Sequence, residues 1–577
     1  MPEVFNIVKR QTTAFEGQKP GTSGLRKPVS TFRQPNYTEN FIQAILTVAK
    51  KDIKPGDPFV LIVGGDGRYF LRECLLDIIV PLCAANGVTQ LIIGQNGIIS
   101  TPAVSCMIRK RKTNGGIILT ASHNPGGPHG DFGIKYNIDN GGPAPEHLTD
   151  AIYEITKTMY EYATISQKMN VDLSQIGTTE FQIEDNRTFK VSIVSSVDDY
   201  VEMVDGIFDF ELIKNFLAGA NGQPPFKIVV DALHGVTGPY LKRIICEIFG
   251  MPETATRNCN PLEDFGGHHP DPNLTYAADL VDVARKDPSV GLAAAFDGDG
   301  DRNMIIGQGA FFVTPCDSLA VIADNAQCIK YFQEKGVRGF ARSMPTSPAV
   351  DRVCKVKNLP VFETPTGWKF FGNLLDADMA SVCGEESFGT GSNHIREKDG
   401  IWALLSWLSI LADRQRQGKS YQVADVVKEH WATYGRDFFT RYDYENMSSE
   451  EGKQIMHRLE TYLEDQKFVG RVFQTEHGMK FQVLKIENFS YTDPVDHSVS
   501  KNQGIMIFLD HDTRLVFRLS GTGSSGATMR MYVNTFSNEK STLNMPASVF
   551  MAPHIELGIN LCGVEYITGR IQPTVIT

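Results

Sequence analysis

The sequence has no excess of basic residues. Its 56 Lys and Arg are outnumbered by 67 Asp and Glu, which gives the 577 residues a formal net charge of −11 at pH 7. Binding to a nucleic-acid backbone depends on neutralising phosphates, and an acidic chain would have to do this against its own overall field. We therefore expect no nucleic-acid partner, although a local basic site for a small anion is compatible with this composition.

The sequence also lacks paired cysteines and long apolar stretches. Its ten cysteines are scattered, with no CxxC pair and no histidine cluster at zinc spacing, as expected for reduced thiols. The N-terminus has no apolar signal core, and the longest strongly apolar stretch, Ile401 to Ala412, is far shorter than the ~20 residues that span a membrane. These absences predict a soluble, cytoplasmic protein without an integral membrane segment.

Several apolar, β-rich runs end in loops of Gly, Asp, Asn or Ser, and helix-like stretches such as 148–163 and 275–286 lie between them. Alternating strands and helices predict an α/β fold, in which ligands bind beyond the carboxyl ends of the strands. At roughly 150 residues per domain, the length allows about four domains, and the recurring pattern indicates that some of them are related. The runs are 59–68, 115–127, 226–235 and 291–302.

The pattern changes after about residue 432. A polar helix is predicted at 448–467, followed by alternating strands near 504–521 and 527–536 and by a last helical stretch. This order predicts a separate C-terminal α+β domain.

Three aspartates follow the apolar run GLAAAF in the loop FDGDGDR. Asp297, Asp299 and Asp301 are separated by glycines that let the backbone turn tightly, so their carboxylates cannot disperse and need a cation. Hard oxygen ligands of this kind suit Mg²⁺. An EF-hand is excluded because Arg302 and Gln308 stand where that loop needs Gly and Glu. A solvated acidic turn is the simpler alternative, and the preceding buried run disfavours it.

Ser122 lies in TASHNPGGPHGDFGIK, directly after the run GGIILT and beside His123. A hydroxyl at a strand end acts as a nucleophile when a base and an anion-stabilising group converge on it. The absence of a GxSxG pattern disfavours a hydrolase of that kind. Taken alone, the segment is better explained as a serine turn ahead of Pro125.

The segment RLSGTGSSGATMR places two arginines and two hydroxyls around a glycine-rich turn: Arg518, Ser520, Thr522 and Arg530. Its GxGxxG pattern does not predict a dinucleotide site, because the next residues are strand-like and too little chain remains for a βαβ unit. Guanidinium forks, hydroxyls and backbone N–H groups instead suit a phosphate monoester. A glycine-rich hairpin with surface arginines is an equal alternative for this motif alone.

Two further segments are less specific. In CGEESFGTGSNHIREKDG, Glu385 and Ser387 offer hydrogen-bonding groups of the sort that hold sugar hydroxyls. Lys398 and Arg396 in the same segment could serve a phosphate or could be solvated charge. The Gly-Trp turn in TPTGWKFF (364–371) could equally be an aromatic anchor in the core.

Together, TASHNPGGPHGDFGIK, DGDGDR, CGEESFGTGS and RLSGTGSSGATMR resemble the α-D-phosphohexomutase superfamily, and within it the eukaryotic phosphoglucomutase branch that includes parafusins. The motifs occur in the order of that family and span most of the chain. The resemblance implies three related α/β domains with mixed sheets and a C-terminal α+β domain around a central cleft. The implied domains are 1–202, 203–314, 315–431 and 432–577.

The resemblance also implies roles for individual residues. The phosphoserine and the three metal ligands that hold Mg²⁺ against its phosphate would be Ser122, Asp297, Asp299 and Asp301. The proton-transfer candidates and charged active-site groups would be His123, Lys398, Arg26, Lys135 and Arg302. The sugar-binding loop and the sugar-orienting turn would be Glu385, Ser387, Thr366, Gly367 and Trp368. The distal phosphate loop would be Arg518, Ser520, Gly521, Thr522 and Arg530.

The implied activity is the interconversion of glucose 1-phosphate and glucose 6-phosphate through a phosphoserine enzyme, with glucose 1,6-bisphosphate as intermediate and activator. Two alternatives stay open: a non-catalytic, parafusin-like scaffold in exocytosis with peripheral vesicle association, and a mutase for another phosphohexose such as mannose or N-acetylglucosamine phosphate. The expected partners are small hexose phosphates.

Two features depart from the pattern of that family. His129 stands where most relatives are expected to have Asn, outside the Ser-His-Asn core, so it bears on tuning of the activity. The polar stretch 164–192 suggests a loop insertion that makes a surface excursion.

Overall fold

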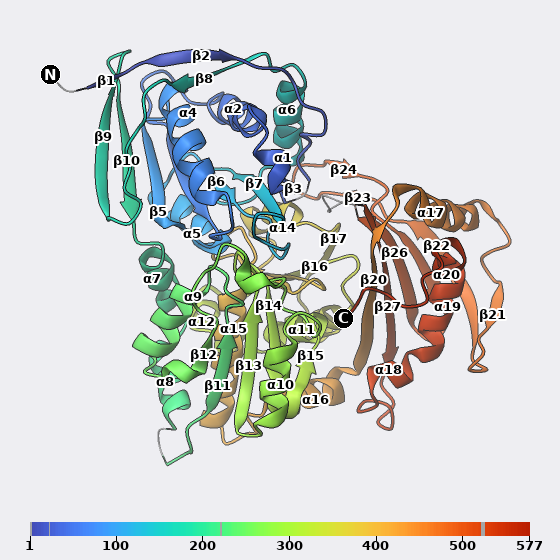
Figure 1. Cartoon of the computed structure of the whole chain (residues 1–577). Coiled ribbons are helices and arrows are strands. Elements are labelled where there is room, and N and C mark those ends of the chain that lie inside the picture. Colours follow the sequence, from blue (N-terminus) through green and yellow to red (C-terminus); the bar gives the residue numbers. More distant parts are fainter. Residues whose placement is uncertain (1–2, 22, 220–221, 521–525) are drawn as a thin grey trace.

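The computed structural model describes residues 3–21, 23–219, 222–520 and 526–577, and four large sheets follow one another along it (Figure 1). We call the parts built on these sheets the first to fourth domains. The first, drawn mainly in blue, lies above the second and third, and the fourth stands to one side with its sheet in brown and orange. The first three sheets are mixed and the fourth is antiparallel.

The first sheet has eight strands, and its central strands are buried on both faces because their sequences are continuously apolar. Its order is β1 (Val4–Phe5), β9 (Gly177–Ile183), β10 (Thr188–Val194), β5 (Gln90–Ile98), β4 (Val60–Gly65), β6 (Gly116–Leu119), β7 (Asp131–Asn137) and β3 (Leu25–Pro28).

The second and third sheets are smaller. The second has the order β12 (Thr256–Arg257), β11 (Lys227–Asp231), β13 (Val290–Phe296), β14 (Asn303–Gly307) and β15 (Phe311–Val313). The third has the order β17 (Val361–Thr364), β16 (Phe340–Ser343), β18 (Val382–Glu385) and β19 (Gly389–Ser392).

The three sheets share one arrangement. In each, a parallel pair of strands is followed by an antiparallel strand: β4, β6 and β7; β11, β13 and β14; β16, β18 and β19. The loop between the last two strands carries Ser122 in the first domain, the aspartates in the second and Ser387 in the third. The first and second domains also share a rare π-helical stretch, Cys74–Ile79 and Lys242–Ile248, after β4 and β11. The predicted relationship between these domains is therefore confirmed.

One continuous hydrophobic core joins the first three domains. It includes Ile62 of β4, Ile228 of β11 and Trp402 of α15 (Gly400–Arg416), a helix that is buried over most of its length. Burial of apolar area is the main favourable term in folding. This shared core therefore holds the loops that carry Ser122, the aspartates and Ser387 in fixed relative positions.

The fourth domain is the predicted α+β unit. Helices α17 (Ser449–Glu464) and α19 (Ala552–Cys562) pack on its sheet, and α17 starts with a capping box made by Ser448 and Glu451. The sheet order is β21 (Val472–Gln474), β22 (Lys480–Asn488), β25 (Ile505–Leu509), β26 (Thr513–Ser520), β27 (Ala527–Ser537), β20 (Arg436–Met447) and β28 (Val575–Ile576).

The interpretation of residues 164–192 as a surface excursion is wrong. Strands β9 and β10 form a hairpin whose second strand pairs in parallel with β5, so this stretch extends the first sheet. Phe181, Phe189 and Val191 are buried in the core. The polar residues that dominate the composition lie on the other, solvated face of the hairpin. The average polarity of the stretch therefore concealed its alternation of buried and exposed side chains.

No helix in the described part of the chain is long and apolar enough to cross a membrane. The ten cysteines are free thiols. The domain boundaries near 202, 314 and 432 stay predictions.

Candidate active site

Ser122 sits in the loop between β6 and β7 with a left-handed backbone, at φ 55°. Its side chain is buried, and Oγ donates to Oδ2 of Asp297 at 2.8 Å, while Nδ1 of His123 lies 3.4 Å away. A Cβ atom at Gly298 would lie 2.7 Å from the Ser122 carbonyl oxygen, so glycine lets the aspartate loop approach this closely. His129 is exposed on the same loop.

A buried ion pair that the sequence reasoning missed supports the Ser122 loop. Arg68 Nη2 donates to the Ser122 carbonyl at 2.9 Å and Nη1 to the Asp131 carbonyl at 2.9 Å, so it joins the two ends of the loop. Asp66 accepts from the Arg68 Nε and from Thr120 Oγ1, which in turn accepts from the Ser122 N–H. A left-handed serine costs free energy, and this network holds it in place. The segment GGDGR after an apolar run was the available signal.

Replacing Asp66 with Asn should leave the Arg68 charge buried without its partner. Breaking such a pair costs about 3–5 kcal/mol, so we expect the thermal transition of the first domain to fall by roughly 10 °C, with reduced turnover. Differential scanning calorimetry measures the shift. The exposed Asp57→Asn in the same domain is the control, and equal behaviour of the two variants would contradict the role of this pair.

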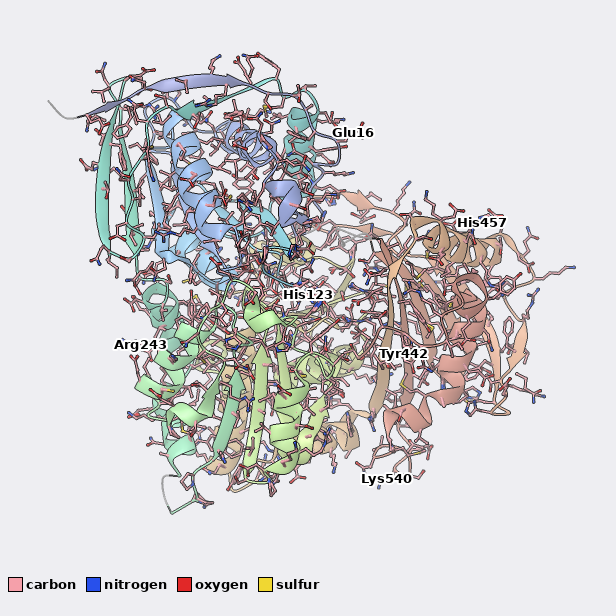
Figure 2. All side chains as sticks on the ribbon, viewed as in Figure 1. Glu16, His123, Arg243, Tyr442, His457 and Lys540 are labelled. Carbon is pink, nitrogen blue, oxygen red and sulfur yellow. The ribbon has the colours of Figure 1, made fainter. Side chains whose placement is uncertain are left out.

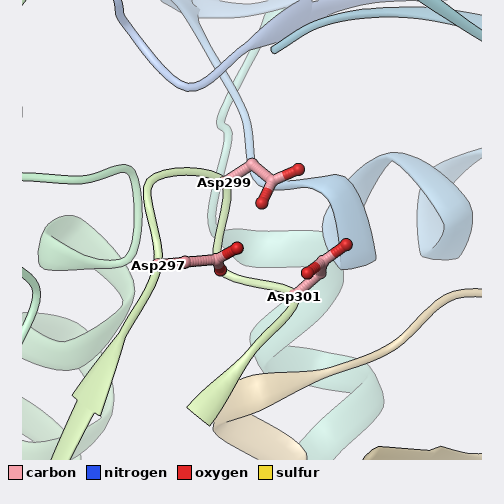
Figure 3. Close-up of side chains that lie close together, drawn as sticks. All are labelled: Asp297, Asp299 and Asp301. Atoms are coloured by element: carbon pink, nitrogen blue, oxygen red, sulfur yellow. The ribbon is translucent and has the colours of Figure 1, made fainter. Parts of the chain in front are cut away.

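The three aspartates lie in the loop between β13 and β14, and their carboxylates gather on one side of it (Figure 3). One oxygen from each lies within 4.8 Å of the others, and all three side chains are buried. Burial and then the neighbouring carboxylates raise the pKa of Asp297 well above its ordinary value and raise that of Asp299. Oδ1 of Asp299 and Oδ1 of Asp301 make no hydrogen bond in the described structure. This group of oxygens fits a metal ion.

Side chains from the first and third domains reach the same loop. Thr101, at the start of α5 (Thr101–Arg111), donates to Oδ2 of Asp299 at 2.8 Å. The ammonium of Lys398 lies 3.1 Å from Oδ2 of Asp301. Burial raises the pKa of Asp301, but the cations around it, first Lys398, outweigh this and lower it.

His123 lies near the middle of the molecule, where the first domain meets the second (Figure 2). Burial, followed by the charges of Arg302, Arg26, Arg530 and Lys398, lowers its pKa well below the ordinary value. These cations come from all four domains, so the predicted charged groups converge on the Ser122 loop. The neutral imidazole is therefore the favoured form.

Lys135 and Arg26 lie on neighbouring strands at the edge of the first sheet, β7 and β3. Lys135 donates a short hydrogen bond to Glu397 of the third domain, which also accepts from Asn137 at 2.8 Å. Burial raises the pKa of Glu397, while Lys135 opposes this. Lys135 thus joins two domains through a carboxylate that the sequence reasoning did not single out.

The sugar-loop residues form a second cluster in the third domain. Glu385, at the end of β18, accepts from the N–H of Gly367 at 2.9 Å, so it fixes the turn ahead of α14 (Trp368–Asp376). Thr366 Oγ1 and Trp368 Nε1 are buried and make no hydrogen bond in the described structure. Ser387 is also buried. Unpartnered polar atoms at one turn are suited to a hydroxylated ligand.

Arg518 and Arg530 are direct cross-strand partners on β26 and β27. Their side chains therefore stand on the same face of the sheet. Arg530 Nε lies 3.6 Å from Asp443, and Arg518 donates to Tyr532 at 3.4 Å. Ser520 is the last residue of β26. Gly521 and Thr522 lie outside the described residues.

Arg396 belongs to a different part of the structure. Its guanidinium donates to Asp376 at 2.6 Å and to the Asn393 carbonyl at 2.9 Å, and its N–H donates to Ser105 of the first domain. It therefore joins domains and is not free for a phosphate.

The sequence matches family models over almost its whole length. Phosphoglucomutase/phosphomannomutase alpha/beta/alpha domains I, II and III match residues 17–163, 198–309 and 316–434. The C-terminal domain of phosphoglucomutase-1 matches residues 436–574. The chain belongs to the phosphoglucomutase/phosphomannomutase family. The predicted family, enzyme class and fold class are confirmed.

Family members of high similarity cover the whole chain. Phosphoglucomutase-1 of Bos taurus is 54% identical over 576 residues and covers 100% of both chains. Phosphoglucomutase 1 of Drosophila melanogaster is 52% identical over 98% of both. The crystal structure of the exocytosis-sensitive phosphoprotein pp63/parafusin, a phosphoglucomutase from Paramecium in its open form, aligns with a TM-score of 0.87 at 46% identity over 100% of both chains.

Proposed function

We propose that this family member interconverts glucose 1-phosphate and glucose 6-phosphate through a phosphoserine at Ser122 and a glucose 1,6-bisphosphate intermediate. One observation carries the proposal: the Ser122 hydroxyl lies 2.8 Å from Asp297, against a buried aspartate group and among converging cations. A phosphate on Ser122 would lie next to the positive charges that phosphoryl transfer requires to stabilise the negative charge of the transferring oxygens.

We propose that the metal is Mg²⁺, held by Asp297, Asp299 and Asp301 together with the phosphate on Ser122. Buried oxygens of Asp299 and Asp301 that accept no hydrogen bond in the described structure support this, because buried anionic oxygens need a cation and hard carboxylates suit Mg²⁺. Bound there, the ion supplies positive charge next to the transferring phosphoryl oxygens.

The side chains around Ser122 divide the remaining chemistry. His123, kept neutral, is suited to accept the proton of the attacking sugar hydroxyl. Burial lowers the pKa of Lys398, but the carboxylates of Asp301, Glu385 and Asp297 together outweigh it, and the net pKa is raised. Lys398 therefore stays protonated and would offer either positive charge or a proton to the phosphoryl group. Arg26, Lys135 and Arg302 would offer positive charge alone. Glu385, Ser387 and the turn 366–368 would hold the sugar.

In this mechanism the phosphoserine transfers its phosphoryl group to one hydroxyl of the bound hexose phosphate. The bisphosphate then reorients and returns its other phosphoryl group to Ser122, so one site serves both ends of the sugar. Arg518, Ser520, Gly521, Thr522 and Arg530 would hold the phosphate that does not react.

Replacing Arg518 with Ala should therefore raise KM by roughly 10- to 100-fold for glucose 1-phosphate and glucose 6-phosphate alike, since charge-assisted hydrogen bonds contribute about 1.5–3 kcal/mol. Some loss of kcat should accompany it, because remote binding energy orients the reacting hydroxyl. Activation of dephosphorylated enzyme by glucose 1,6-bisphosphate should weaken in parallel.

Steady-state kinetics in both directions test this. The control is Arg471→Ala, which removes an arginine of the same domain that is 45% exposed and pairs with Asp465. If Arg518→Ala and Arg530→Ala both kept the wild-type KM and bisphosphate activation, the loop would be structural.

A coupled assay of glucose 1-phosphate conversion decides the function itself. We expect turnover with this substrate and much lower turnover with mannose 1-phosphate or N-acetylglucosamine 1-phosphate. A preference for either of these would make the chain a mutase for another phosphohexose, and no turnover with any would favour a non-catalytic scaffold. We propose a cytoplasmic site of action.

A further inference from the structure

A buried histidine lies behind the active-site lysine. His394 follows β19, and its side chain is 1% exposed and stacked on Trp402. Ser392 Oγ lies 2.6 Å from Nδ1 of His394, and Oδ2 of Asp399 lies 2.9 Å from Nε2. A carboxylate only accepts, so Nε2 carries the proton and donates to Asp399. Nδ1 shares a hydrogen bond with the hydroxyl of Ser392, so both ring nitrogens are held.

Asp399 is the centre of this network and directly follows Lys398. Its fully buried carboxylate accepts from Tyr200 Oη at 2.6 Å and from the N–H of Trp402 at 3.0 Å, where it caps α15. Its own N–H donates to the Thr390 carbonyl. Tyr200 lies on α7 (Asp198–Ile207), so Asp399 joins that helix to the third domain. A buried carboxylate keeps one orientation only while its donors stay in place.

Lys398 is held from both sides. On one side, Glu397 is tied to Lys135 of the first domain, and on the other Asp399 is tied to α7. The lysine stem lies on Gly389, where an added Cβ would be only 2.3 Å from Cδ. Its ammonium ends 3.1 Å from Asp301. The backbone at 397–399 therefore decides where this charge stands.

We propose that His394 is a positioning residue for Lys398: it holds Asp399 against α7 and α15 and so keeps the lysine ammonium on the aspartate loop. This deepens the proposed function and rests on the role given there to Lys398. Without the imidazole, the Asp399 carboxylate loses one of its three hydrogen-bond donors, and the 397–399 backbone relaxes.

Replacing His394 with Leu should lower kcat by about tenfold with little change in KM, since even a 1 Å misplacement of a catalytic group can cost about a hundredfold in rate. His394→Gln retains a donor toward Asp399 and should recover part of the loss. Ser392→Ala, which removes the hydrogen bond at Nδ1 and keeps the ring, should show a smaller loss of the same kind. Steady-state kinetics of the full-length enzyme with glucose 1-phosphate give kcat and KM for each variant.

A double-mutant cycle with Lys398→Met separates positioning from structure. In the lysine variant, His394→Leu and Ser392→Ala should have no further effect on kcat, because the group they position is gone. If the loss of kcat in His394→Leu or Ser392→Ala were as large in the Lys398→Met background as in the wild type, the inference would be overturned. A wild-type kcat in both His394→Leu and Ser392→Ala would also overturn it.

The matched control is His430→Leu, another buried histidine of the third domain, on α16 (Val423–Tyr434), whose ring lies 4.0 Å from Asp324. It should lower thermal stability without lowering kcat. Near-normal turnover of Lys398→Met alone would instead contradict the proposed role of Lys398, and this inference with it. If His394→Leu does not fold, the Ser392→Ala cycle decides alone.

Discussion

Replacing Ser122 with Ala is expected to lower kcat by roughly ten-thousandfold or more, the order of loss seen when a covalent nucleophile is removed. The hydroxyl of Ser122 donates to Asp297, and alanine removes it while keeping the backbone and nearly all the volume. The wild-type protein should carry phosphate on Ser122, detected as a mass increase by intact-mass measurement and assigned by peptide mapping. The alanine variant should carry none there.

A buried serine outside the site provides the control. Ser406 lies within α15, donates to the carbonyl of Trp402 and is fully buried. Ser406→Ala should keep turnover and the phosphate on Ser122. Near-normal turnover of Ser122→Ala would refute the phosphoserine mechanism, whatever the thermal stability of the variant.

Replacing Asp299 with Asn should lower kcat by roughly a thousandfold, because a bound metal ion contributes several kcal/mol to stabilising the charge of the transition state. The substitution removes one ligand charge and nearly preserves volume. It should also raise the Mg²⁺ concentration needed for half-maximal activity. Titration of activity with Mg²⁺ after chelation measures both effects.

Asp231 offers a matched control because it ends β11, the strand beside β13, and is equally buried. Its carboxylate accepts from Asn258 and from the Leu233 N–H and takes no part in the aspartate group. Asp231→Asn should lower stability and leave the Mg²⁺ titration unchanged. Full activity of the wild-type protein in excess chelator would show that no such metal is used.

The sequence was sufficient for the parts of the site that are contiguous in the chain. The Asp-Gly repeat after a buried strand predicted three carboxylates at one point, and they lie there. Asp66 and Arg68 were missed although GGDGR follows an apolar run, because an acid and a base in a Gly loop are usually solvated. Only the fold buries this pair beneath the Ser122 loop. The hairpin at 177–194 was missed because the polar residues of its exposed face outnumber the apolar residues of its buried face in the sequence.

The sequence by itself determined the family and the α/β class and supplied the candidate groups of each loop, because these follow from residue types and from short spacings along the chain. Tertiary structure alone decided which loops meet. Ser122 and Asp297 are 175 residues apart, and Lys135 and Glu397 are 262 apart. The physical reason is that the three mixed sheets share one hydrophobic core, and burying that core fixes where the loop of each domain points.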